Sequence, residues 1–209
     1  MSEGLDFEGM AAANTETVLS ATNITLLLAG AIVAFLATVA GSTWLAHRYA
    51  RMPATRLFLT LREFPPAFKL VALGVCGNTL IVQALAVSDV YMQTKVVHAS
   101  AHEYFQYLSW VRLLGTSHAH VFGFMVLYGA LAVLLSFSSA RPGLKFLVIS
   151  VLTWAGVFDV ASWWGMKAIS GRFEFLAALS GMASSVSSLV AVAVIIQNLG
   201  GGRGRYATL

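Results

Sequence analysis

The sequence predicts an all-α integral membrane protein, a bundle of five transmembrane helices. Of its 209 residues, 58% are hydrophobic and only 11% are charged, whereas soluble domains carry about 25% charged residues. Its mean hydropathy is +0.77. Five apolar runs approach or exceed the roughly 20 residues that a helix needs to cross a hydrocarbon core. None alternates with the two-residue period of an outer-membrane strand. The runs cover residues 24–46, 67–87, 117–137, 145–166 and 173–199.

The loop charges predict an N-out, C-in orientation, because cytoplasmic loops of membrane proteins are enriched in Lys and Arg. Residues 48–69 carry five basic side chains against one acid, the loop after the third run has Arg141 and no acid, and the tail has two arginines. The net charge of +4 reflects these loops, so we expect no nucleic-acid partner. We expect a bacterial inner-membrane protein with three parts: a polar periplasmic N-terminus (1–23), a five-span membrane domain (24–199) and a cytoplasmic tail (200–209).

The connection between the second and third runs is rich in aromatic side chains. Residues 97–110 contain no helix breaker, and the next glycine is Gly115. Tyrosine and tryptophan are enriched at the membrane–water interface. We therefore expect an interfacial helix on the outer side, with His98 and His102 on one face because they are four residues apart.

Two histidines open the third run. His118 and His120 point about 200° apart on a helix, so they cannot easily hold one metal together but can serve two sites on opposite faces. Gly123 follows His120 by three residues, on nearly the same face, and leaves room for a flat group to approach. An ionisable side chain near lipid must be paired, hydrogen-bonded or ligated. We therefore treat this pair as candidate cofactor ligands.

Asp159 in the fourth run is the other ionisable side chain whose placement in the membrane costs free energy, since it lies about two turns below the expected outer surface. It can receive the second ring N–H of a ligating histidine and fix its tautomer. It can also pair with Lys167 or with a neighbouring helix. Asn78 and Gln83 in the second run are expected to join helices by hydrogen bonds.

Residues 117–124, Ser-His-Ala-His-Val-Phe-Gly-Phe, resemble the His-x-His helix of heme-copper oxidase catalytic subunits, especially the nitric oxide reductase and cbb3-type branch. The resemblance implies that His118 ligates a high-spin haem and His120 a low-spin haem near the outer face. The chain departs from that family because it has far fewer spans and lacks the further histidines that bind copper or iron. We therefore expect no complete oxygen- or NO-reducing centre. The single cysteine, Cys76, excludes covalent c-type haem attachment.

Three functions are consistent with these residues. The first is an electron-transfer subunit with one haem b, held by His120 or His118 together with His98 or His102. Bis-histidine ligation leaves no open position and suits electron transfer between a quinone or another membrane subunit and a periplasmic cytochrome. The second is a non-haem copper or zinc site built from the same histidines with Asp159. The third is a cofactor-free accessory subunit of a larger complex. All three favour a subunit over a complete enzyme.

Overall fold

The structure is a computed structural model that describes residues 21–49 and 60–200. The predicted N-terminal segment and C-terminal tail therefore lie outside the described residues, apart from 21–23 and Gly200. The described residues form helices and no strand. The helices are α2 (Ala21–Tyr49), α3 (Pro66–Tyr91), the π-helix η1 (Met92–Val97), α4 (Ala101–Tyr107), α5 (Trp110–Ser136), α6 (Pro142–Ala168), the 3-10 helix η2 (Gly171–Phe173) and α7 (Glu174–Gly200).

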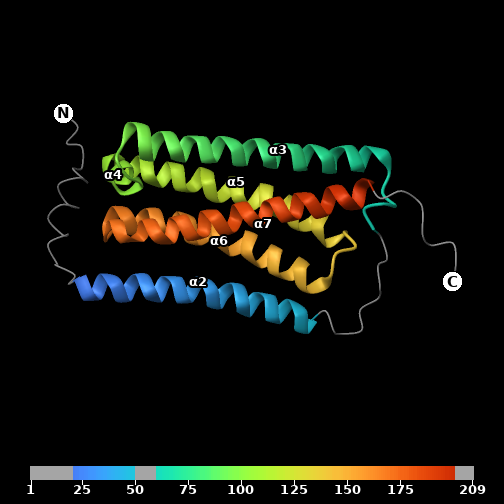
Figure 1. Ribbon diagram of the computed structural model, residues 1–209, viewed down its shortest axis with the longest axis horizontal. Coiled ribbons are helices and arrows are strands. Elements are labelled where there is room, and N and C mark those ends of the chain that lie inside the picture. The colour runs from blue at the N-terminus through green and yellow to red at the C-terminus, as the bar shows by residue number, and fades with distance from the viewer. Residues whose placement is uncertain (1–20, 50–59, 201–209) are drawn as a thin grey trace, which may run out of the picture.

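Five of these helices, α2, α3, α5, α6 and α7, are long and apolar enough to cross a membrane. They run antiparallel in chain order, so that α4 and the start of α2 lie at the same end of the bundle (Figure 1). This confirms the predicted five-span helical bundle. We call the end that carries α4 the outer end, following the orientation predicted from the loop charges.

The outer connection differs from the single helix predicted over residues 97–110. The second span continues through η1, the chain then turns, and α4 covers only seven residues. The Ser100 hydroxyl caps α4 by accepting a hydrogen bond from the Glu103 N–H at 3.1 Å, and the Glu103 carboxylate accepts one from the Ala99 N–H at 3.0 Å. These bonds resemble a capping box, which fixes a helix start. Gly115, the next glycine after this run, lies inside α5.

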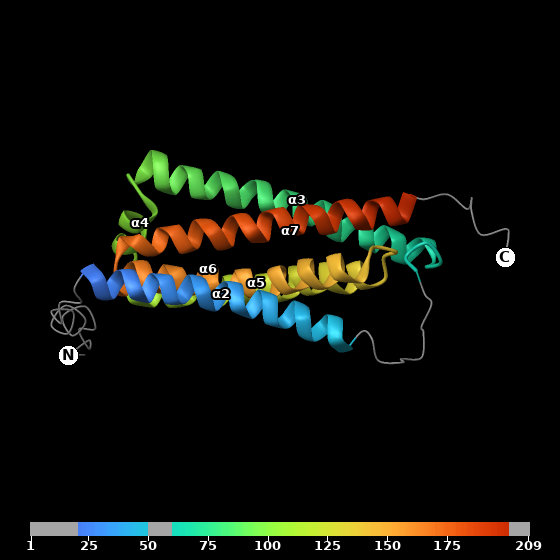
Figure 2. The same cartoon turned by 60° about the horizontal axis from the view of Figure 1, so that its bottom comes forward.

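The helix α7 is central to the packing, because it contacts each of the other four spanning helices and pairs most extensively with α6. Figure 2 shows α7 running between α3 and α6. The first span, α2, packs mainly on α6. Its one buried side chain among the described residues, Phe35, lies against the Phe158 ring with a centroid separation of 5.2 Å. The bundle is therefore a compact set of four helices with α2 on its flank.

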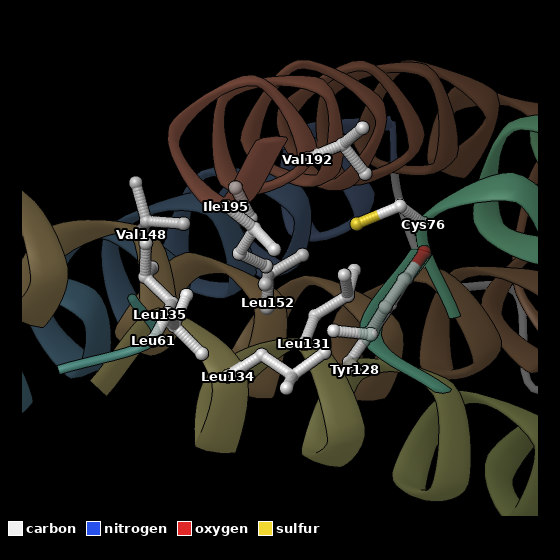
Figure 3. Close-up of a cluster of buried hydrophobic side chains, with 12 residues drawn as sticks. Leu61, Cys76, Tyr128, Leu131, Leu134, Leu135, Val148, Leu152, Val192 and Ile195 are labelled. Atoms are coloured by element: carbon white, nitrogen blue, oxygen red, sulfur yellow. The ribbon is translucent and has the colours of Figure 1, made fainter. Parts of the chain in front are cut away.

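Two hydrophobic clusters fill the bundle, one in each half. The inner cluster joins α3, α5, α6 and α7 (Figure 3) and includes Cys76, Leu131, Leu135, Leu152, Val192 and Ile195. The outer cluster contains Phe105, Leu108, Leu113, Met166, Phe173 and Leu176. Along α7, Leu176 belongs to the outer cluster and Ala191 to the inner one, and four buried serines lie between them: Ser180, Ser184, Ser187 and Ser188. A polar level thus separates the two apolar halves.

Candidate functional site

The two histidines of the third span lie deeper than the helix mouth where they were predicted. The difference arises because α5 begins at Trp110 rather than at residue 117, after a cap in which the Ser109 hydroxyl accepts from the Arg112 N–H at 3.3 Å. With a rise of 1.5 Å per residue, His118 and His120 lie about 12 and 15 Å from the start of the helix. Both side chains are exposed on the bundle surface, so their depth places two imidazoles beside lipid or a bound group.

His120 is held in one orientation by three neighbours. Its Nδ1 lies 2.9 Å from the Thr116 carbonyl oxygen. A carbonyl only accepts, so Nδ1 carries the proton, and in the neutral imidazole Nε2 then has a lone pair that can bind a metal. The ring meets Trp163 of α6 edge-on at 4.9 Å and Phe124 at 5.9 Å between centroids. At Gly123, an added Cβ would have no atom within 4 Å, so the space beside His120 is open.

His118 has different surroundings from His120, in keeping with the predicted angle of about 200° between them. Its side chain makes no hydrogen bond or ring contact within the part of the chain that the structure describes, whereas its neighbour Ser117 is buried. The Ser117 hydroxyl accepts a hydrogen bond from the Trp164 indole N–H at 2.9 Å. Ser117 and His120 therefore lie on the side of α5 that faces α6, and His118 lies on the outside of the bundle.

His98 and His102 do not share a helical face, contrary to the prediction. His98 has an extended backbone (φ −120°, ψ 156°) after η1, and its ring lies 5.5 Å from both Tyr104 and Tyr107. Burial raises the pKa of the Tyr104 phenol, and the Asp89 carboxylate acts in the same direction.

His102 lies within α4 and packs against Gly171, where an added Cβ would come within 2.8 Å of the imidazole Cγ. Its Nδ1 is buried and has no hydrogen-bond partner within residues 21–49 and 60–200. A buried ring nitrogen without a partner is unusual, so this atom is a candidate ligand.

Asp159 lies beside a serine and not beside a histidine. The Ser180 Oγ of α7 lies 3.5 Å from Asp159 Oδ1 and donates its proton to the Leu176 carbonyl at 2.7 Å, and the Trp163 side chain lies beside the carboxyl group. Because Trp163 also touches the His120 ring, one indole lies between the carboxyl group and the histidine. Lys167, considered as a partner, instead donates to the Gln106 carbonyl at 2.8 Å.

Further polar side chains from α3 and α5 meet α7 between Ser180 and its inner end. The Gln83 amide donates to the Ser188 hydroxyl at 2.8 Å and accepts from the Ser185 hydroxyl at 3.2 Å. This confirms that Gln83 joins helices, whereas Asn78 is exposed. The Tyr128 side chain lies near Gln83 and Ser184. We call this set the polar layer: Gln83, Tyr128, Asp159, Ser180, Ser184, Ser185 and Ser188.

Most of the polar layer was missed from the sequence, because Tyr128 and the serines of α7 are unremarkable one at a time. The available signal was their period. Serines at 180, 184, 187 and 188 recur at three- and four-residue intervals, which places them on one face of a helix. A polar face on an apolar span indicates an interior surface that meets other polar groups.

The predicted metal-ligand set is not brought together. Within residues 21–49 and 60–200, no three His, Cys, Asp or Glu side chains are close enough to hold one metal ion. His98, His102, His118, His120 and Asp159 all fall in that range.

Comparison with known proteins identifies one family. Residues 83–205 match the Aq_1264_TM model, which describes a transmembrane helical domain, and this segment is more than half of the 209-residue chain. It contains η1, α4, α5, α6 and α7 and the end of α3. No curated protein and no solved structure matches the chain. The chain therefore belongs to the Aq_1264_TM family of transmembrane helical domains and is a multi-pass membrane protein.

Proposed function

We propose that this protein is a membrane electron-transfer subunit that holds one haem b in the outer half of the bundle, with His120 as an axial ligand. The observation that carries the proposal is the bond between His120 Nδ1 and the Thr116 carbonyl. Ligating histidines usually donate their second ring N–H to a carbonyl or carboxylate, which fixes the ring and its tautomer. His120 has this arrangement without any metal.

The surroundings of His120 support a flat, apolar group. The open space at Gly123 lies one turn from the imidazole, and the aromatic rings of Phe124 and Trp163 pack against that imidazole. A haem bound here would supply one-electron transfer, and the protein would set its ligation and polarity. No step of that chemistry requires a titratable residue beside the iron.

The second ligand is proposed to be His102. Its buried Nδ1 has no protein partner among the described residues, whereas the His98 ring packs between two tyrosines. In this function the protein would sit in a bacterial inner membrane. Its redox partners would be a quinone or another membrane subunit on one side and a periplasmic cytochrome on the other.

A reduced-minus-oxidised visible spectrum of the protein, purified from its own membranes, tests the proposal. The wild type should show the bands of a low-spin haem b. His120→Ala should abolish these bands or convert them to a high-spin form, because loss of one axial ligand opens a coordination position. His118→Ala, on the other face of α5, and His47→Ala, at the far end of α2, are the matched controls and should leave the bands unchanged.

Each result has a distinct meaning. A wild-type protein that carries no haem in its native assembly refutes the function and favours a cofactor-free accessory subunit. Bands that survive His120→Ala but disappear in His118→Ala refute the ligand assignment and keep the haem. Copper or zinc in stoichiometric amount, without haem, supports the non-haem metal site instead.

A further inference from the structure

Asp159 is a half-buried side chain in the outer half of α6. It is nine residues from the outer end of α6, which corresponds to about 13 Å along the helix. Of the other acidic side chains in the described spans, Glu174 is the first residue of α7, and Asp89 is exposed and accepts a hydrogen bond from Gln93 of its own span. Asp159 is the one acid of the described spans with a recorded hydrogen-bond contact to a side chain of another spanning helix.

The partners of Asp159 are neutral. The Ser180 Oγ lies 3.5 Å from Asp159 Oδ1 while its proton goes to the Leu176 carbonyl at 2.7 Å, and the uncharged Trp163 side chain lies beside the carboxyl group. No ion pair involves Asp159 in the described part of the chain. Isolated charges are costly in a medium of low polarity unless they are paired, so this arrangement favours the neutral form of the carboxyl group.

The basic side chains packed near α6 are engaged elsewhere. Lys145 donates to backbone carbonyls at the inner end of α5, and Lys167 donates to a carbonyl of α4. The others are in the first turn of α5, in η2, or in the last turn of α2: Arg112, Arg172, His47 and Arg48. None of them neutralises a charge at Asp159.

The elements that face Asp159 bring one other titratable group near it, Tyr128 of α5. On the outer side, the Trp163 ring lies between His120 and Asp159. From α7 come only serine hydroxyls, and from α3 the amide of Gln83. Every one of these groups can hydrogen-bond, and none carries a fixed charge.

We propose that Asp159 is a reversible proton-binding site in the membrane interior. Its ligand is a proton, taken up by the carboxylate and released from the carboxylic acid, with no other bond made or broken. The hydroxyl of Ser180 accepts and donates hydrogen bonds, so it stabilises the ionised form by donating and can turn when the proton returns. The proton-binding site needs no haem, so a failed test of this site and a failed test of the proposed function can be distinguished.

Infrared spectroscopy of the full-length protein in lipid tests the site directly. A protonated carboxylic acid has a carbonyl stretching band that an ionised carboxylate lacks. The wild type should show this band, and the band should disappear as the pH rises. The chain has three aspartates, Asp6, Asp89 and Asp159. Carbon-13 labelling of aspartate must shift the band, and Asp159→Asn must remove it.

Ser180→Ala tests the direction in which the titration of the carboxylic acid band shifts. The Ser180 hydroxyl can turn from the Leu176 carbonyl to donate to the carboxylate once the proton has left. Its loss should therefore raise the pH at which the band disappears, by about one pH unit. Ser187→Ala is the matched control, because Ser187 is a buried serine of the same helix with no recorded bond to Asp159. That variant should leave the titration unchanged.

Two results would overturn the inference. The first is a wild-type spectrum without any carboxylic acid band that shifts on aspartate labelling, which would mean that Asp159 stays ionised throughout. The second is a labelled band that does not titrate, which would make the acid a fixed hydrogen-bond donor. The labelled wild type decides both points even if Asp159→Asn fails to fold.

Discussion

Gly165→Ala is the sharpest test of the packing that supports the candidate site. Gly165 lies on α6 against Phe173, and an added Cβ would come within 2.4 Å of Phe173 Cδ1 and 2.6 Å of Cγ. Carbon atoms normally approach to about 3.5–4.0 Å, so the ring must move by roughly 1 Å. The clash involves the base of the ring, and Phe173 is only 7% exposed within the outer hydrophobic cluster. The ring therefore cannot swing aside without disturbing its neighbours.

The expected cost follows from two opposing terms. Overpacking a filled core costs about 1–3 kcal/mol, and this clash belongs in the upper half of that range. Replacing glycine by alanine inside a helix returns about 1 kcal/mol. The net loss of unfolding free energy should therefore be about 1–2 kcal/mol. Gly129→Ala on α5 is the matched control, because an added Cβ there has no atom within 4 Å, and it should be neutral or slightly stabilising.

Unfolding by SDS in mixed micelles, followed by tryptophan fluorescence, measures both variants. Phe173→Leu should partly rescue Gly165→Ala, because a smaller side chain relieves the same clash and the two effects should not add. Equal unfolding midpoints for Gly165→Ala and the wild type would refute the close contact between α6 and η2. Strict additivity with Phe173→Leu would show that any destabilisation has another cause.

Three further predictions concern other contacts. Gln83→Leu should lower the unfolding free energy by about 1 kcal/mol in the same assay, because it removes both hydrogen bonds to the α7 serines; no change would show that these bonds contribute nothing net. Trp164→Phe and Ser117→Ala should each destabilise the bundle, with a double variant no worse than either, because both remove one hydrogen bond; additive losses would contradict that bond. In a background without the native cysteine, a cysteine at Ala99 should react with an impermeant reagent from the periplasm and one at Gly143 only from the cytoplasm; access from the same side would refute the topology.

The spans could be predicted because the signal is local. Each apolar run is long enough to cross a membrane whatever it packs against, and the five runs correspond to α2, α3, α5, α6 and α7. The start of α5 was placed too late because residues 110–116 are less apolar than the run that follows. Hydroxyl caps carry the missing information, since Ser100 and Ser109 mark the starts of α4 and α5.

The candidate site was less predictable because its contacts join different helices. The sequence gives the angle between His118 and His120 on one helix, but not which of them faces α6. In the same way, the sequence shows that a carboxyl group at Asp159 costs free energy in the membrane, but not whether the rotation of α7 places a serine beside it. Ser180 does so, and the indole of Trp163 takes the place expected for a histidine. Such pairings depend on helix rotation, which local patterns do not determine.

The serines of α7 also bear on the order in which the bundle assembles after its helices enter the bilayer. Ser180, Ser184 and Ser188 each donate to a carbonyl of their own helix, at 2.7, 2.9 and 2.8 Å. An isolated α7 can therefore enter lipid with these hydroxyl protons already bonded. Gln83 has its recorded bonds on α7 rather than on α3, so an isolated α3 carries an unsatisfied amide at a cost in hydrocarbon. Association of α3 with α7 removes that cost. The polar layer thus provides a driving force for association of the inserted helices, which lipid-facing apolar surfaces do not provide.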